Sequence, residues 1–110
     1  MKKIICFSLL LISSFCIAQT GEKGLSSEYK KADTELNNVY NKLKNKLGSV
    51  DKKALIEAQK AWLKFRDSNC KFISKEESEG GIIANKMKID CLTQSTLERT
   101  KELKEMLTEF

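Results

Sequence analysis

The stretch Gln59-Lys-Ala-Trp-Leu-Lys-Phe-Arg-Asp-Ser-Asn-Cys70 decides the fold that this sequence predicts. It holds the only Trp of the chain, Trp62, and one of its two Arg residues, Arg66. On an α-helix, Trp62, Arg66 and Cys70 share one face with Gln59. Burying an Arg beside a Trp costs desolvation energy unless partners are present, so we expect this helix to pack against a specific neighbour.

The N-terminal residues have the pattern of a secretory signal peptide. Two lysines precede an apolar run of about 14 residues that ends at Ile17, and Ala18 follows. Such a run is too short to anchor a protein across a bilayer, so no integral membrane span is expected. We predict cleavage after Ala18, with a signal peptide over residues 1–18, a flexible lead over 19–25, and an exported domain that is periplasmic or secreted. A lipoprotein acylated at Cys16 is the minor alternative, because the residue before Cys16 is bulky.

The charge of the predicted mature chain is mildly positive. Without the two leader lysines, 18 basic and 15 acidic residues remain, a net charge of +3. Charges of both signs alternate along the predicted helices, which is typical of a solvated helical surface. Export, mild charge and the lack of aromatic residues within a basic cluster argue against nucleic acid as a partner. The chain has no His, so neither Cys–His catalysis nor the usual metal sites can be built, and we expect no enzyme, metal or cofactor.

Helical spacing of apolar residues divides the rest of the chain into three segments. Ser26 or Ser27 can cap a first helix that runs to about Leu47, and Gly48 suits a left-handed end position after it. Asp51 can cap a second helix, which fades into a polar loop before a third helix over about 82–108. With no segment of period two, these elements predict an all-α, three-helix up-down-up bundle. Leu36, Trp62 and Phe65 are the predicted core anchors, and other core candidates are Tyr29, Ala32, Val39, Tyr40, Leu43, Leu47, Leu55, Ala58, Asn69, Phe72, Ile83, Met87, Cys91, Leu92, Leu103, Met106 and Leu107.

Two cysteines remain after removal of the leader, Cys70 and Cys91, in an oxidising compartment. One lies on the helix that enters the polar loop and the other on the helix that leaves it. A disulfide between them would close a loop of about 20 residues and stabilise the fold by roughly 3 kcal/mol. A redox pair usually has Cys-x-x-Cys spacing, and a zinc site would need two more ligands, so we predict a structural disulfide.

Polar residues share the inner faces of the predicted helices and need partners there. We predict an ion pair of Asp33 with Arg66 or with Arg99. An internal network that fixes the register of the helices is the favoured interpretation, and a ligand or partner site on the same groups is the alternative. The predicted network comprises Asp33, Asn37, Tyr40, Gln59, Arg66, Asp67, Thr96 and Arg99.

Three motifs follow one another along the chain. They are Asp33-x-x-Leu36-Asn37-x-x-Tyr40, Gln59-x-x-Trp62-x-x-Phe65-Arg66-Asp67-x-x-Cys70 and Cys91-Leu92-x-x-x-Thr96-x-x-Arg99-x-x-x-Leu103. Together they span about 70 residues and resemble the LprI family of lysozyme inhibitors, small exported bacterial domains. The resemblance implies a helical, disulfide-linked domain over residues 26–110 and, for some members, inhibition of lysozyme. Many members carry a further cysteine pair near the mature N-terminus, which this chain lacks.

The resemblance implies a bacterial envelope protein that binds and blocks a lysozyme-type muramidase without catalysis. Animal lysozymes are basic, and an inhibitor gains association rate from an acidic surface. The local acidic patch of this chain is Glu76-Glu77-x-Glu79, so we expect Glu76, Glu77 and Glu79 to form a partner-binding loop. A solvated loop without a binding role is the simpler interpretation of the same residues. The alternative function is an envelope protein–protein interaction module whose partner is not lysozyme.

Overall fold

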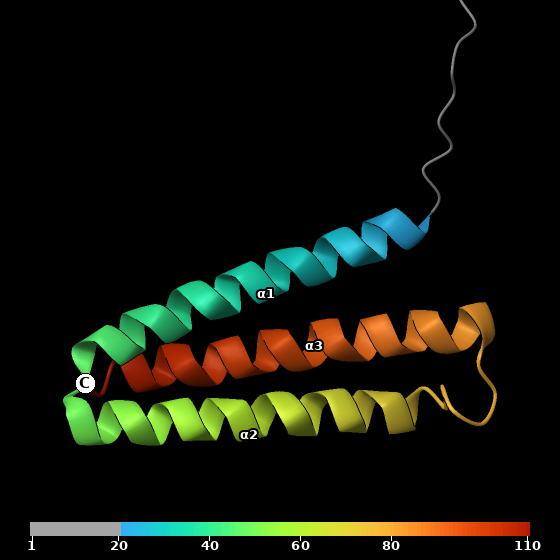
Figure 1. Cartoon of the computed structure of the whole chain (residues 1–110). Helices are drawn as coiled ribbons and strands as arrows, with labels where there is room; N and C mark the ends of the chain where they lie inside the picture. Colours follow the sequence, from blue (N-terminus) through green and yellow to red (C-terminus); the bar gives the residue numbers. More distant parts are fainter. Residues whose placement is uncertain (1–20) are drawn as a thin grey trace, which may run out of the picture.

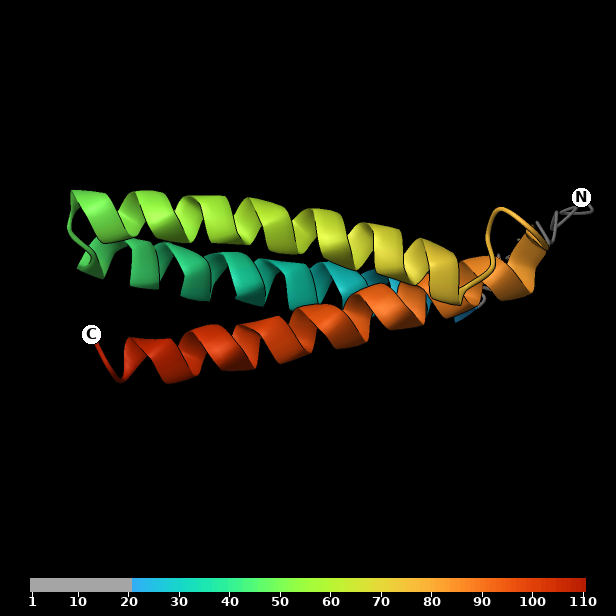
Figure 2. The same cartoon turned by 90° about the horizontal axis from the view of Figure 1, so that it is seen from below.

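A computed structural model describes residues 21–110, which form three long α-helices (Figure 1). The helices are α1 (Gly21–Lys46), α2 (Ser49–Ile73) and α3 (Gly81–Leu107). α1 and α3 run in the same direction and α2 runs in the opposite one (Figures 1 and 2). The predicted all-α, up-down-up bundle is therefore confirmed. The predicted signal peptide, and Cys16 within it, lie outside the described residues.

α1 begins earlier than the sequence predicts. It starts at Gly21 rather than at a cap formed by Ser26 or Ser27, so residues 21–25 are helical instead of belonging to a flexible lead. No Pro in this stretch removes a backbone donor, and extending an existing helix adds a hydrogen bond for each residue ordered. α1 therefore continues toward the N-terminus as far as Gly21.

The turn between α1 and α2 is shorter than predicted, and its capping residues differ from the predicted ones. Gly48 has φ −69° and ψ 171°, an extended conformation at the N-cap of α2, so the predicted left-handed end position is wrong. Its carbonyl accepts the first bond of α2 from the N–H of Lys52 at 2.8 Å. Asp51 therefore lies inside the first turn of α2 and is not its cap. There its carboxylate faces the partial positive charge of the helix N-terminus.

The aliphatic core occupies one half of the bundle. We call this the turn half, because it surrounds the α1–α2 turn and the end of α3, and we call the opposite half, around the α2–α3 connection, the loop half. Predicted anchor Leu36 is buried, with 1% of its surface exposed. Partly buried Trp62 packs against the same cluster. The buried cluster comprises Leu36, Val39, Leu43, Leu55 and Leu103.

α1 and α3 make the closest backbone packing in the bundle. Of the four buried residues of α3, three are small: Ala84, Thr96 and Thr100. Small side chains allow two helix backbones to approach each other closely. The Thr96 hydroxyl donates to Leu92 O at 2.6 Å and the Thr100 hydroxyl to Thr96 O at 2.8 Å, so these buried groups are satisfied within α3.

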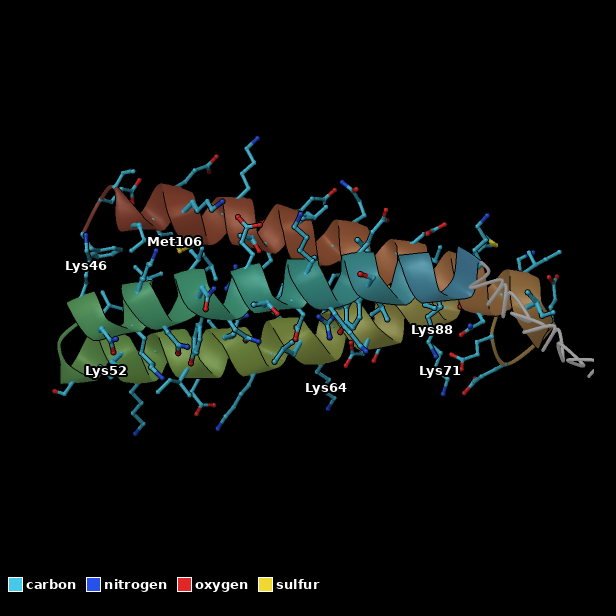
Figure 3. All side chains as sticks on the ribbon, turned by 90° about the horizontal axis from the view of Figure 1, so that it is seen from above. Lys46, Lys52, Lys64, Lys71, Lys88 and Met106 are labelled. Atoms are coloured by element: carbon cyan, nitrogen blue, oxygen red, sulfur yellow. A yellow bond between two sulfur atoms is a disulfide. The ribbon has the colours of Figure 1, made fainter. Side chains whose placement is uncertain are left out.

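Charged side chains cover the outer faces of all three helices (Figure 3). Over residues 21–110, no helix is long and apolar enough to cross a membrane.

Candidate functional site

Residues 74–80 form the α2–α3 loop, which follows the end of α2. The N–H of Lys75 donates to Phe72 O at 3.1 Å, and the N–H of Glu76 donates to Lys71 O at 3.4 Å. This pair of bonds is the Schellman arrangement that ends many helices. Lys75 has φ 56°, so it occupies the left-handed position that glycine usually fills. The loop therefore has a defined conformation from its first residue.

A disulfide ties the base of this loop, as predicted. Cys70 in the last turn of α2 is bonded to Cys91 on α3, with 5.5 Å between the Cα atoms and a sequence separation of 21. Cys70 is fully buried. The disulfide therefore joins the two helices that carry the loop.

Each glutamate of the loop faces a lysine. The hydrogen bond from Lys71 holds the pKa of Glu77 below its usual value, and the same contact raises the pKa of Lys71. Because ammonium groups already neutralise these carboxylates, the loop lacks the net acidic patch that the sequence predicts. A role for these glutamates in binding a partner stays a prediction. The ion pairs are Glu76–Lys88 at 2.9 Å, Glu77–Lys71 at 2.7 Å and Glu79–Lys75 at 3.5 Å.

Large apolar side chains lie on the surface of the loop half. Phe65, a predicted core anchor, is 64% exposed, and Phe72 is 81% exposed, so both core assignments are wrong. The buried positions of α2 in this half are Arg66 and Cys70. A stripe through residues 58, 65 and 72 is rotated from that face, and the bundle leaves it uncovered. We call Phe65, Phe72, Ile73, Ile82, Ile83 and Met87 the loop-end apolar surface.

A similar rotation, between the predicted inner stripe and the face that is buried, explains the wrong core assignments on α3. Ile83 and Met87 are predicted core residues, but both are exposed, and Ala84 is the buried residue of that turn. Ile73 and Ile82 are not among the predicted core residues, because neither fits the assumed inner stripe. Their places in the sequence could have indicated them, since Ile73 directly precedes the polar loop and Ile82 is the second residue after it.

A groove with a volume of about 570 Å³ runs beside Phe72 and the loop. Its walls combine one aromatic ring with ion-paired lysines and glutamates. An apolar centre with a charged rim is the composition of many protein-binding surfaces. The lining residues are Ser68, Lys71, Phe72, Lys75, Glu77, Ser78 and Glu79.

Arg66 is buried, as predicted, and links α2 to its neighbours. Its Nη1 donates to the Thr96 hydroxyl on α3 at 3.1 Å, and its Nε donates to Asp67 Oδ1 at 2.9 Å. The guanidinium lies 5.3 Å from the ring centroid of Trp62 and 5.7 Å from that of Tyr29 on α1. The stacked rings and the bond to Thr96 together give this cation contacts with all three helices.

Arg99 makes a second link between α3 and α2. Its Nε donates to Gln59 Oε1 at 3.1 Å, and its Nη1 donates to Glu102 Oε2 at 2.9 Å. Its guanidinium lies 5.8 Å from the ring centroid of Trp62. Trp62 thus contacts two arginines from two helices.

The predicted ion pair of Asp33 with an arginine is wrong. Arg66 pairs with Asp67 and Arg99 with Glu102, each a neighbour on its own helix. These carboxylates are more than half exposed and keep much of their hydration, which lowers the cost of the pair. Within residues 21–110, the side-chain hydrogen bond of Asp33 is with Asn37 Nδ2 at 3.4 Å.

Tyr40, the remaining member of the predicted network, packs against the aliphatic core, with Lys44 Nζ 5.2 Å from its ring centroid. In the part of the chain that the structure describes, every buried side-chain nitrogen and oxygen has a hydrogen-bond partner. Satisfied buried groups favour the interpretation of the arginines as a structural network. The loop-end apolar surface is then the stronger candidate for binding.

Comparisons with known proteins support the family resemblance of the sequence. The family model described as "Lysozyme inhibitor LprI" matches residues 16–103. "Uncharacterized protein R02472" from Rhizobium meliloti (strain 1021) is 32% identical over 93 residues, which cover 73% of this chain and 66% of that protein. The chain therefore spans just under two thirds of the length of that relative. No solved structure matches the chain.

Proposed function

This chain belongs to the LprI family of lysozyme inhibitors, and on that premise we propose that it is an exported envelope protein that blocks a lysozyme-type muramidase. It acts by binding and performs no catalysis. The match of the family model over residues 16–103 is the observation that carries this proposal.

The contact with the enzyme is made by the loop half. The α2–α3 loop stands at the end of the bundle (Figure 1), and the Cys70–Cys91 disulfide ties its base. Phe72 and Ile82 flank the loop and are 81% and 86% exposed. A pre-ordered loop between exposed apolar residues loses little conformational entropy on binding and offers anchors for an enzyme cleft.

The charges of the loop contribute selectivity rather than most of the affinity. Glu76, Glu77 and Glu79 already pair with lysines, and a basic lysozyme has to replace those lysines as the partner. Exchanging one ion pair for another changes the free energy of binding little. Burial of apolar surface therefore has to supply most of the binding free energy.

A cell-wall lysis assay tests this function, with oxidised protein titrated against a basic animal lysozyme. We expect saturable inhibition near stoichiometric ratios. The double variant Phe72→Ser/Ile82→Ser should raise the half-inhibitory concentration by about ten-fold or more, because exposed aromatic and aliphatic anchors commonly dominate an interface. The variant Val50→Ser is the matched control, since Val50 is 80% exposed at the opposite end of the bundle.

The triple variant Glu76→Gln/Glu77→Gln/Glu79→Gln separates charge from apolar contact. We expect it to raise the half-inhibitory concentration by only about three-fold, in keeping with exposed ion pairs of small net worth. Loss of inhibition in this variant alone would assign the contact to the acidic residues instead. Absence of inhibition at large excess, with the helical fold verified by circular dichroism, would overturn the function itself.

One observation favours a second candidate function. The described residues have a net charge of +3, and their exposed apolar surface does not require a basic partner. An envelope interaction module with a different protein partner would use the same loop-end apolar surface. A photo-crosslinking residue at position 72, used in intact cells, distinguishes the two: it should capture a muramidase under the first proposal and another envelope protein under the second.

A further inference from the structure

Five lysines gather around the α1–α2 turn, at one end of the bundle. Residues 42–53 hold five lysines and one aspartate, a net charge of +4. Glu105 and Glu109 near the end of α3 lie at the same end, so five lysines stand against three carboxylates there, a net charge of 5 − 3 = +2. We call Lys42, Lys44, Lys46, Lys52 and Lys53 the cationic pole. It surrounds the α1–α2 turn, where Figure 3 labels Lys46 and Lys52.

The lysines of the cationic pole lack carboxylate partners. In the loop half, Lys71, Lys75 and Lys88 each pair with a glutamate, whereas the scattered lysines Lys30, Lys64 and Lys86 form no ion pair within residues 21–110. Among the described residues, no member of the cationic pole forms an ion pair, and Lys44 instead lies over the ring of Tyr40. The acidic groups of this end, which are Asp51 on α2 with Glu105 and Glu109 near the end of α3, form no ion pair within residues 21–110 either. Because five lysines outnumber these three carboxylates and none of them is paired, this end keeps a modest positive field toward solvent.

Helix stability does not explain this arrangement. Lys44 and Lys46 lie in the last turn of α1, where a cation favours the helix dipole. Lys52 and Lys53 lie near the start of α2, where the same dipole disfavours a cation. A structural role accounts for the first pair alone, so the second pair needs another explanation.

Exposed apolar groups accompany these lysines. Val50, at the tip of the α1–α2 turn, is 80% exposed, and Phe110, at the same end of the bundle, is 64% exposed (Figure 2). Lysines mixed with protruding apolar side chains suit the headgroup region of a bilayer, where charge meets phosphate and the apolar group enters the acyl boundary. A soluble polyanion would leave Val50 and Phe110 in water.

We propose that the cationic pole docks the protein on the anionic phospholipid surface of a bilayer. The occupant is a layer of phosphate headgroups, recognised by unpaired lysines around Val50. α2 has 25 residues and is about 37 Å long, so docking at the pole directs the loop half away from the membrane. This proposal is independent of lysozyme inhibition, because it concerns the opposite end of the bundle.

Vesicle co-sedimentation tests the proposal, with oxidised protein expressed from the full chain. Vesicles of phosphatidylcholine alone are compared with vesicles containing about one third phosphatidylglycerol, at low and high salt. We expect binding to the anionic vesicles that salt weakens. The triple variant Lys42→Gln/Lys46→Gln/Lys53→Gln should lower the partition coefficient by roughly 100-fold, because each lysine near an anionic leaflet contributes about five-fold.

Lys30→Gln/Lys64→Gln/Lys86→Gln is the matched control, since it removes three exposed lysines outside the pole and gives the same net charge. We expect it to bind like the unaltered protein, and Val50→Ser to bind anionic vesicles several-fold more weakly.

An equal loss in both triple variants would overturn the proposal, because binding would then follow net charge alone. Full competition by soluble polyphosphate, with no effect of Val50→Ser, would overturn the lipid as occupant. Lys and Gln have similar helix propensities, and circular dichroism verifies the fold of each variant.

Discussion

Arg66 illustrates how one charged side chain can be accommodated among three helices. Its guanidinium donates to Thr96 across the bundle and to Asp67 on its own helix, and it stacks near Trp62 and Tyr29. Asp67 is 61% exposed, so the anion of the pair stays hydrated while the cation is buried. Arg66 therefore stabilises the fold mainly through stacking, packing and its hydrogen bond to Thr96, and less through its ion pair with Asp67.

This division of energy predicts unequal effects for the two members of the pair. Arg66→Ala removes the stacking and the link to α3, and we expect the free energy of unfolding to fall by about 2 kcal/mol. Asp67→Asn should change it by less than about 0.5 kcal/mol, as for an exposed ion pair. Urea unfolding followed by circular dichroism measures both. If Arg66→Ala does not fold, Arg66→Met keeps much of the packing and should lie between the two; equal effects of all variants would contradict the argument.

At the level of secondary-structure elements, the end of α2 places a residue other than glycine in a backbone conformation that favours glycine. Lys75 follows α2 with φ 56°, in the left-handed position that lacks a steric penalty only for glycine. Two backbone bonds of the Schellman arrangement hold it there. Its side chain adds an exposed ion pair with Glu79, which is worth little.

Replacing Lys75 by glycine should therefore stabilise the protein. We expect Lys75→Gly to be more stable than Lys75→Ala by about 1 kcal/mol, because both remove the ammonium but only glycine relieves the left-handed conformation. The alanine variant is thus the control for the lost side chain. Thermal melting of the two variants side by side measures the difference. Equal melting temperatures would mean that the loop conformation is not the strained one described above.

Helical spacing predicts which segments are helices, but less well which face of each is covered. Leu36, Gln59, Arg66 and Thr96 are buried as predicted, because each follows the dominant stripe of its helix. Phe65 is exposed because apolar character alone does not reveal whether a neighbouring helix covers its position. Contacts between helices decide that, and the pattern of one helix does not contain them. The pairing of the loop glutamates depends equally on contacts, because the spacing rule for charged pairs applies to helices and residues 74–80 are not helical.

Across the whole molecule, the two halves of the bundle are stabilised by different means. The turn half contains the aliphatic cluster of Leu36, Val39, Leu43, Leu55 and Leu103. The loop half relies on the Cys70–Cys91 disulfide, small buried residues and the arginine network, and it leaves its large apolar side chains outside. Loss of the disulfide should therefore affect the loop half first.

Reduction of the disulfide thus separates the two proposed binding surfaces. Opening a closed loop of 21 residues should lower the free energy of unfolding by about 3 kcal/mol, and amide exchange should accelerate around residues 70–91 while the turn half stays protected. Lysozyme inhibition should weaken in parallel, since the loop at positions 74–80 would no longer be pre-ordered. Binding to anionic vesicles should persist, because the cationic pole lies at the opposite end. We expect the double variant Cys70→Ala/Cys91→Ala to behave as the reduced protein does. Concerted loss of both activities, with the turn half still protected from exchange, would show that the two surfaces are not separate.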